Sequence, residues 1–187
     1  MHLANLAREC AVHVFEPIRR NAKLIDASAA HNYLEKVAVN NCAVGDSVGS
    51  VEFTVSEDSA FSSMVGTNRV PVSGRISVPI LTSDAYLNEN RFELIRVLKF
   101  DLEGAEAQVI EGAKALLQDK KRRPRLILIE LYESNMIPFA SSTESVVDAL
   151  LSWGYTLHKV VNRNGATAPY EYDLEDNLYN FVFLSTD

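Results

Sequence analysis

Three apolar segments of this sequence each end on acidic side chains. They are Val12–Phe15 before Glu16, Ile95–Phe100 before Asp101 and Glu103, and Leu126–Ile129 before Glu130. Short apolar segments of this kind are typical of buried strands, and ligands of open α/β sheets bind at the carboxyl ends of the strands. A carboxylate is costly there unless it has a partner or faces water, so the pattern indicates a functional site. Capping of the following helix is an equally good explanation for any one of these acids.

Glu16 has the position of a nucleoside ligand. A carboxylate at the end of a strand, beside the first crossover, can accept two hydrogen bonds from the vicinal hydroxyls of a ribose. Dinucleotide and S-adenosylmethionine sites share this geometry. Each charge-assisted hydrogen bond of this kind contributes about 1.5–3 kcal/mol. Glu16 is therefore a candidate ribose ligand.

Asp101 and Glu103 form the densest acidic pair. They lie two residues apart on an extended turn, and Gly104 allows a close approach of the backbone. Two carboxylates placed in this way can hold a cationic ligand, orient an acceptor hydroxyl, or take its proton as a general base. We expect Glu106, in the first turn of the next helix, to interact with the helix dipole instead.

The elements that position these acids alternate between strand and helix periods, which is typical of a parallel sheet covered by helices. The first half predicts a strand over Val12–Phe15, a helix over Ile18–Leu34 that follows Pro17, a strand over Val37–Val44, a half-exposed strand over Gly49–Ser56 and a polar loop over Ser56–Arg69. We interpret that loop as a candidate lid.

The second half continues the alternation and then reverses it. It predicts a strand over Ile95–Phe100, a helix over Ala105–Leu117, a strand over Arg125–Tyr132, a helix from a capping box at Ser141 and Glu144 to a left-handed stop at Gly154, a strand over Tyr155–Val161, a polar loop over Asn162–Asn177 and a strand over Tyr179–Leu184. The last two strands are expected to be antiparallel neighbours, because no helix separates them. The basic run Lys120–Arg123 is interpreted as a solvated helix end.

Composition limits the class of protein. The chain has 187 residues, of which 47% are hydrophobic, and a net charge of -7, which is typical of one soluble globular domain. The negative charge argues against a nucleic-acid partner. No segment has the pattern of a secretory leader or the length of a membrane span. Cys10 and Cys42 lack the spacing of a metal or redox motif, so we expect a cytoplasmic protein with reduced thiols and no metal.

Five short segments follow one another in a recognisable order. They are Phe15-Glu16-Pro17, Ala43-Val44-Gly45-Asp46, Leu81-Thr82-Ser83-Asp84, Lys99-Phe100-Asp101-Leu102-Glu103-Gly104-Ala105-Glu106 and Ile127-Leu128-Ile129-Glu130. This series resembles the FkbM-type family of S-adenosylmethionine-dependent methyltransferases, from about Val12 to the end of the chain. The resemblance implies an α/β fold with a Rossmann-like, mostly parallel sheet and an antiparallel C-terminal strand. It also implies methyl transfer from S-adenosylmethionine to a hydroxyl of a sugar-like, polyketide or other small acceptor.

The resemblance also implies roles for individual residues. Glu16 would bind the ribose of the donor, Val44 and Asp46 would lie beside its adenine, Asp101 and Glu103 would line the transfer site, and Glu130 would form the far wall of that site. The donor is a sulfonium cation, so nearby carboxylates favour its binding. Catalysis would then consist of orientation helped by a proton acceptor.

The glycine-rich turn of the family is missing from this sequence. The eight glycines contain no GxGxxG pattern, and none precedes Glu16. The family's turn holds the methionine end of the donor, and its strand lies between the strands that end at Glu16 and Asp101. We therefore expect one domain over residues 1–187 that lacks its first strand. The loss of this strand would expose two facing strand edges or force them to pair directly, and exposed edges would favour self-association into a homo-oligomer.

Several explanations remain open at this point. The start codon is assigned too late, the chain is a truncation that has lost catalysis, or another element or subunit supplies the strand. The main alternative function is a catalytically inactive binding or interaction module with a methyltransferase fold. A nicotinamide-dependent dehydrogenase ranks last: it would also place Glu16 on a ribose, but it needs a glycine-rich turn and lacks the cluster around Asp101.

Overall fold

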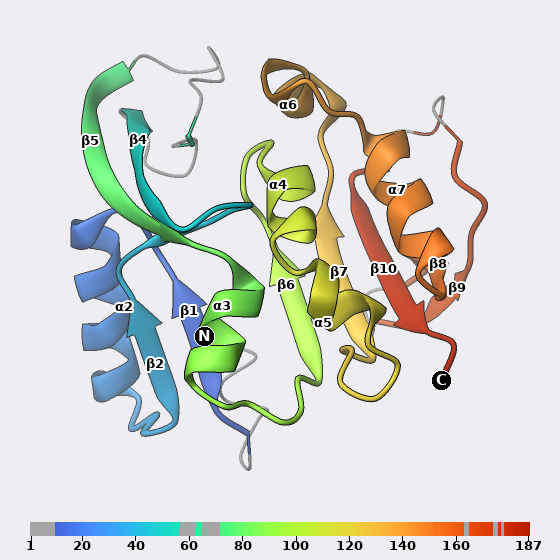
Figure 1. The fold of residues 1–187 in the computed structure, drawn as a ribbon, viewed down its shortest axis with the longest axis horizontal. Helices are drawn as coiled ribbons and strands as arrows, with labels where there is room; N and C mark the ends of the chain where they lie inside the picture. Colours follow the sequence, from blue (N-terminus) through green and yellow to red (C-terminus); the bar gives the residue numbers. More distant parts are fainter. Residues whose placement is uncertain (1–9, 57–62, 65–71, 163–164, 174–175, 177) are drawn as a thin grey trace.

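The computed structural model describes residues 10–56, 63–64, 72–162, 165–173, 176 and 178–187. Within these residues the chain forms three β-sheets with helices packed around them (Figure 1). Most of the predicted lid, Ser56–Arg69, lies outside the described residues.

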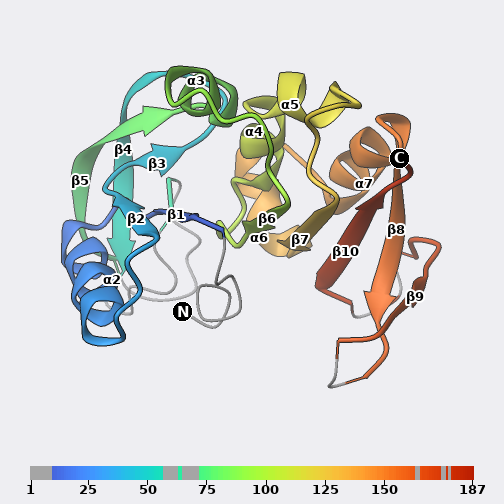
Figure 2. The same cartoon turned by 90° about the horizontal axis from the view of Figure 1, so that it is seen from below.

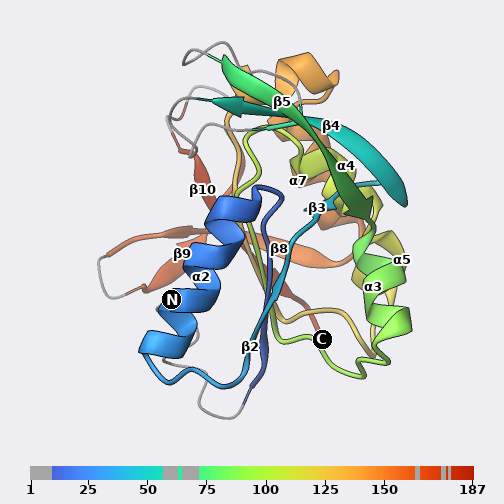
Figure 3. The ribbon, with the colours of Figure 1, turned by 90° about the vertical axis from the view of Figure 1, so that its left-hand side faces the viewer.

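The N-terminal unit has the predicted order of strand, helix and strand. Its elements are β1 (Val12–Phe15), α2 (Arg19–His31) and β2 (Val37–Asn40). β1 and β2 pair in parallel, with Val12 opposite Val37, and α2 lies along the pair (Figure 3). Pro17 and the extended Ile18 precede the helix, where the missing N–H of proline is least costly.

The predicted strand Val37–Val44 is in fact two strands in different sheets. After β2 the chain bends, and β3 (Ala43–Val44) joins the second sheet. In the bend, Nδ2 of Asn41 donates to the carbonyl oxygens of Glu16 at 2.8 Å and Pro17 at 3.0 Å. These bonds hold the bend against the end of β1, so the chain leaves the first sheet there.

The second sheet has the order β3-β5-β4. β4 (Gly49–Ser56) confirms the predicted strand, and it pairs antiparallel with β5 (Val72–Leu81). Its half-exposed pattern does not continue to the end, because Thr54 and Ser56 are buried. The sequence did not reveal β5 as a strand. Gly74 and Pro79 interrupt its apolar pattern and most of its residues are exposed, so the alternation of apolar and polar residues that is typical of a strand is weak.

The third sheet has the order β6-β7-β10-β8-β9. Its strands are β6 (Val97–Phe100), β7 (Leu126–Glu130), β8 (Tyr155–Val160), β9 (Thr167–Pro169) and β10 (Asn180–Ser185). β6 and β7 are parallel, and β10 runs antiparallel to both of its neighbours, β7 and β8. The predicted antiparallel arrangement of the last long strands is confirmed. β9 is an addition, because it forms within the segment predicted as a polar loop.

Short helices connect the strands of the second and third sheets. They are α3 (Ser83–Glu89), α4 (Glu106–Glu111), α5 (Lys114–Gln118), α6 (Glu133–Met136), the 3-10 helix η2 (Ile137–Phe139) and α7 (Thr143–Ser152). The predicted helix Ala105–Leu117 is therefore two helices, which separate at Gly112. None of the helices in the described part of the chain has the length and apolar character needed to cross a membrane.

The ends of α7 differ slightly from the prediction. The capping box lies one residue later than expected: Ser142 Oγ accepts from the Ser145 backbone N–H at 3.1 Å, and Ser145 Oγ accepts from the Ser142 N–H at 3.3 Å. Gly154 has a φ of 87° and follows the helix as the predicted left-handed stop. The cap shifts because a neighbouring serine provides the same side-chain chemistry as the predicted pair.

The main hydrophobic core lies between the five-stranded sheet and the helices α4, α5 and α7 (Figure 2). Its largest fully buried side chains include Phe181, Phe183, Ile127 and Leu117. Burial of side chains of this kind contributes about 1.5–3 kcal/mol each. This core holds the ends of β6 and β7 in place, and with them the acids that follow these strands.

The basic run Lys120–Arg123 is only partly a solvated helix end. Arg123 is 5% exposed, which corrects the prediction for this residue. Its guanidinium forms a salt bridge with Asp187, donates to the carbonyl oxygen of Trp153, and lies 5.4 Å from the ring centroid of Tyr155. Arg123 therefore ties the segment before β7 to the end of β10.

The described strands do not form the single, mostly parallel sheet that the resemblance implied. Three strand pairs among the described residues are parallel and four are antiparallel. In the same residues β1 pairs with β2 alone and β6 pairs with β7 alone, so β1 and β6 are not joined directly. β1, β6 and β7 nevertheless all end toward the top of Figure 1, so the acids that follow these three strands leave them at the same side of the molecule.

Candidate active site

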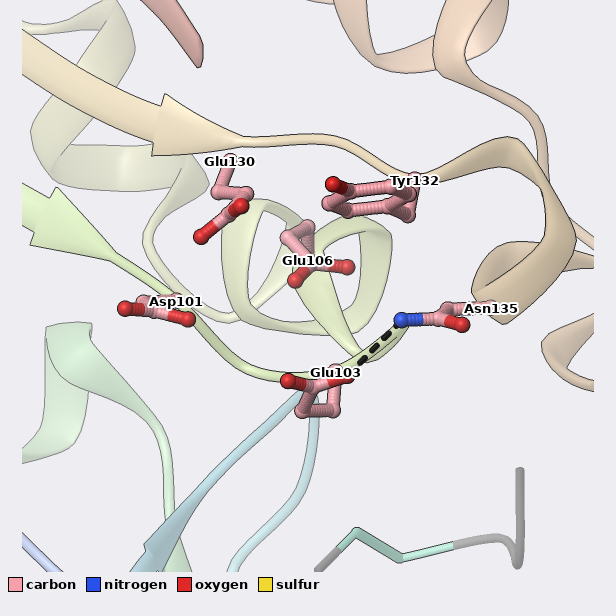
Figure 4. Close-up of a pocket in the computed structure, with 6 residues that line it drawn as sticks. All are labelled: Asp101, Glu103, Glu106, Glu130, Tyr132 and Asn135. Carbon is pink, nitrogen blue, oxygen red and sulfur yellow. Dashed lines mark hydrogen bonds between the residues drawn. The ribbon is translucent and has the colours of Figure 1, made fainter. Parts of the chain in front are cut away.

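The acids that follow β6 and β7 line one small pocket (Figure 4). The lining residues are Asp101, Glu103, Glu106, Glu130, Tyr132 and Asn135. The pocket has a volume of about 10 Å³, which is room for about one water molecule. The structure thus brings together the predicted residues Asp101, Glu103 and Glu130, whose catalytic role stays a prediction.

The turn between β6 and α4 needs an unusual backbone to present its acids. Glu103 has a φ of 55° and Gly104 a φ of 110°, both in the left-handed region. A Cβ at Gly104 would lie 2.1 Å from the carbonyl oxygen of Asn135, so only glycine fits. This close approach brings the Asn135 side chain to Glu103, whose Oε2 accepts a hydrogen bond from Nδ2 at 2.8 Å.

Glu106 holds this turn from inside the pocket. Its Oε1 accepts hydrogen bonds from the backbone N–H groups of Leu102 at 3.1 Å and Gly104 at 3.3 Å. The residue is 2% exposed. This burial raises the pKa of Glu106, although the hydrogen bonds from the turn act in the opposite direction.

Glu106 lies in the first turn of α4, as expected for an interaction with the helix dipole, but its carboxyl group also belongs to the pocket. The prediction missed this second position. The signal for it is the spacing of two residues between Gly104 and Glu106 at a helix start, from which a glutamate can reach back to the N–H groups of the turn.

Tyr132 and Asn135 are pocket residues that sequence reasoning missed. Tyr132 stacks on Tyr179, with ring centroids 4.0 Å apart and planes at 11°. Asn135 is 3% exposed and lies in the short helix α6. Tyr132 stands at the end of a predicted strand and Asn135 in an aperiodic segment, so neither residue type nor spacing distinguishes them.

The electrostatic character of the pocket is strongly acidic. Its lining, as far as the described residues form it, contains four carboxyl groups and no basic side chain. Lys99 Nζ contacts Asp101 Oδ2 at 2.7 Å from outside the lining, and both side chains are about half exposed, so this pair is largely screened by solvent. No group of three or more His, Cys, Asp or Glu residues in the described part of the chain is arranged to hold a metal ion. The pocket therefore offers carboxylates as acceptors of protons and hydrogen bonds.

Glu16 lies at the end of β1 and is half-buried. Its Oε1 accepts a hydrogen bond from the backbone N–H of Ile18 at 2.8 Å, and the Asn21 side chain provides a second hydrogen bond. Burial raises the pKa of Glu16, while these two hydrogen bonds favour its ionised form. A carboxylate can accept about four hydrogen bonds, so about two sites remain for a ligand.

Val44 and Asp46 lie on either side of Gly45, at the end of β3. Val44 is half-buried against the main core, and Asp46 is exposed. A Cβ at Gly112 would lie 1.9 Å from the carbonyl oxygen of Gly45, so this turn packs directly on the junction of α4 and α5. Neither these two residues nor Glu16 belong to the described lining of the acidic pocket.

A larger cavity adjoins the acidic pocket through a shared residue. It has a volume of about 140 Å³ and is lined by residues of the five-stranded sheet, among them Leu128, Glu130 and Val182. Glu130 lines both cavities. Glu130 therefore lies between the acidic pocket and a space large enough for part of a small molecule.

Among solved structures, this chain is similar to the crystal structure of methyltransferase FkbM from Methylobacillus flagellatus KT, with a TM-score of 0.58 and 14% sequence identity. The similarity covers 98% of this chain and 40% of that chain, so this chain spans less than half the length of its structural relative. At this identity the likeness shows the fold alone. No curated protein matches the chain.

The family comparison covers most of the sequence. Residues 1–157 match the family described as "Methyltransferase FkbM domain", and this range includes all the predicted site residues. The match agrees with the order of the five segments in the sequence and with the fold of the solved relative. This chain belongs to the FkbM methyltransferase family.

Proposed function

We propose that this chain transfers the methyl group of S-adenosylmethionine to a hydroxyl of a sugar-like or other small acceptor. Family membership supports methyl transfer in general. The observation that carries the proposal further is the pocket in which Asp101, Glu103 and Glu130 meet. A hydroxyl oxygen must lose its proton when it gains a methyl group, and a positioned carboxylate is a suitable acceptor for that proton.

The three carboxyl groups are supported in different ways. Asn135 orients Glu103 through a hydrogen bond, and Lys99 contacts Asp101 at the solvent-exposed edge of the pocket. Glu130 lies across the pocket from Glu103 (Figure 4). We propose that these acids orient the acceptor hydroxyl and take its proton, so that catalysis consists mainly of orientation.

The residues at the end of β1 fit the nucleoside half of the donor. The two acceptor sites that remain on Glu16 match the two vicinal hydroxyls of a ribose. Val44 and Asp46, which end β3, would flank the adenine. S-adenosylmethionine, when bound, supplies the methyl group as part of a sulfonium cation. We further propose that the protein acts in the cytoplasm, where Cys10 and Cys42 stay free thiols.

A continuous Rossmann-like sheet needs one more strand between β1 and β6. We propose that this strand comes from outside the described residues, because the edges of β1 and β6 are not joined within them. The same open edges favour a second candidate function, a binding or interaction module that uses the methyltransferase fold without catalysis. The sequence agrees with both candidates, since its eight glycines contain no GxGxxG pattern.

Calorimetric titration with S-adenosylmethionine separates these functions. We expect weak binding, above micromolar dissociation constants, because these 187 residues contain no glycine-rich turn that could hold the methionine end of the donor. Glu16→Ala should weaken the affinity by at least about tenfold, since each charge-assisted hydrogen bond to the ribose contributes about 1.5–3 kcal/mol. Glu35→Ala is the matched control, because Glu35 is an exposed glutamate of the same strand–helix–strand unit.

Three outcomes would contradict parts of this proposal. An unchanged affinity in Glu16→Ala would remove Glu16 from the ribose site. Micromolar affinity in the unaltered chain would show that donor binding does not require a glycine-rich turn within these residues. No binding at millimolar donor would overturn the proposed transfer for this chain and favour the interaction module.

A further inference from the structure

Glu106 leaves one acceptor of the acidic pocket without a partner. Its Oε1 accepts two backbone hydrogen bonds, whereas its Oε2 is buried and has no hydrogen-bond partner. Figure 4 shows the carboxyl group in the middle of the pocket, between Glu130 and Glu103. A buried carboxylate oxygen without a donor is costly, so this atom is suited to accept a hydrogen bond from a bound group.

The charge of the pocket selects the sign of that group. Four carboxyl groups line the pocket, and Lys99 pairs with one of them, that of Asp101, from outside the lining. A phosphate or carboxylate would be repelled here, and a cation would be attracted. A cationic donor would also relieve the burial of charge at Glu106, which is 2% exposed.

The size of the pocket limits the cation further. A volume of about 10 Å³ accommodates one group the size of a water molecule. A primary ammonium head is of this size and carries three N–H donors. One of these can reach Oε2 of Glu106, while the others face Glu103 and Glu130. A quaternary ammonium is too large and has no donor.

We propose that the acidic pocket binds a protonated primary amine and that Glu106 determines this specificity. The source of the amine is the acceptor, which would then be an amino alcohol, such as an amino sugar, with its reacting hydroxyl near the ammonium group. This assignment to the acceptor rests on the proposed methyl transfer. The binding of the amine itself does not.

The test is a titration of the full chain with methylammonium, in which NMR monitors the chemical shifts of the Leu102 and Gly104 backbone amides. These amides donate to Glu106, so they report on a ligand at its carboxyl group. We expect saturable shifts with methylammonium and none with methanol, which lacks the charge, or with tetramethylammonium, which is too large.

Glu106→Gln isolates the proposed interaction. The glutamine keeps one oxygen for the two backbone donors, so the turn stays in place, but an NH₂ group replaces the unpaired acceptor. Binding of methylammonium should weaken at least tenfold, because a charge-assisted hydrogen bond is lost. The control is Glu111→Gln, which removes the same charge from the far end of α4, where Glu111 pairs with Lys114 in solvent. Its affinity for methylammonium should be unchanged.

Two results would overturn the proposal. Equal shifts with methanol or tetramethylammonium would show that the pocket does not recognise charge or size. An equal loss of methylammonium affinity in Glu111→Gln would show that the effect of Glu106→Gln comes from net charge alone. If Glu106→Gln does not fold, as judged by circular dichroism, the comparison of methylammonium with methanol in the unaltered chain still decides.

A final arm identifies the source of the amine. Saturating S-adenosylmethionine should leave the binding of methylammonium intact. If it displaces methylammonium, the pocket holds the ammonium group of the donor and the assignment to the acceptor is wrong. If S-adenosylmethionine does not bind at all, the proposed methyl transfer is wrong, but the methylammonium titration still tests the amine site independently.

Discussion

Replacing Gly112 with alanine tests the contact that joins the two predicted halves of the site. Gly112 separates α4 from α5, and its backbone packs on the turn at Gly45, between Val44 and Asp46. The φ of Gly112 is -70°, which alanine adopts without strain. In the absence of the contact, the substitution would stabilise the fold by about 0.4–1 kcal/mol, because alanine lowers the conformational entropy of the unfolded chain.

The contact reverses this sign. The new Cβ would lie 1.9 Å from the carbonyl oxygen of Gly45, whereas ordinary contacts begin at 3.4 Å, so the two segments must separate by the difference, about 1.5 Å. Both atoms are attached to backbone, so no side-chain rotation relieves the overlap. Overpacking of this kind costs about 1–3 kcal/mol. We therefore expect the melting temperature to fall by about 2–12 °C, at about 2–4 °C per kcal/mol for a chain of this size.

Thermal unfolding followed by circular dichroism measures this effect. Gly74→Ala is the control, because a Cβ at Gly74 in β5 has no neighbour within 4 Å, and its stability should change by less than about 0.5–1 kcal/mol. NMR shifts at Gly45 and Asp46 should appear only in Gly112→Ala. A melting temperature of Gly112→Ala equal to or above that of Gly74→Ala would refute the close packing of the two segments.

Two further predictions concern the acidic pocket. Gly104→Ala should destabilise the chain by more than about 2 kcal/mol, because it combines a left-handed φ of 110° with a new Cβ only 2.1 Å from the carbonyl oxygen of Asn135, and urea unfolding would measure the loss. Burial raises the pKa of Glu106, so between its ordinary pKa and the raised value the folded chain holds a proton that the unfolded chain has released. The contribution of Glu106 to stability is therefore most favourable below its ordinary pKa and declines as the pH rises through this window. Urea midpoints from acidic to neutral pH should fall less steeply in Glu106→Gln than in the unaltered chain, and parallel curves would contradict this assignment.

Local patterns in the sequence were sufficient for the elements that carry the acids. β1, β7 and the helix α2 were predicted because their apolar spacing is maintained over several residues. The stop at Gly154 was predictable because a left-handed helix end requires a particular residue type. The convergence of Asp101, Glu103 and Glu130 followed in turn, since parallel strands bring their carboxyl ends to one edge.

Other features depend on segments that are distant in the sequence. The predicted strand at Val37–Val44 divides because Asn41 bonds to the end of β1, and the predicted helix at Ala105–Leu117 divides where it meets Gly45. The spacing of apolar residues along a segment shows which of its side chains are buried, but it does not show which other segment covers them. For this reason the division of these elements could not be predicted.

The sequence by itself determined the family, the acids and the strands that they follow, because these depend on residue type and local spacing. The tertiary structure decided that Glu106 and Asn135 belong to the acidic pocket and that Glu16 does not. It also decided that Arg123 is buried by the end of β10. The physical reason is the same in each case. The burial and hydrogen bonding of a polar side chain depend on contacts between distant segments, and the spacing of residues within one segment does not show these contacts.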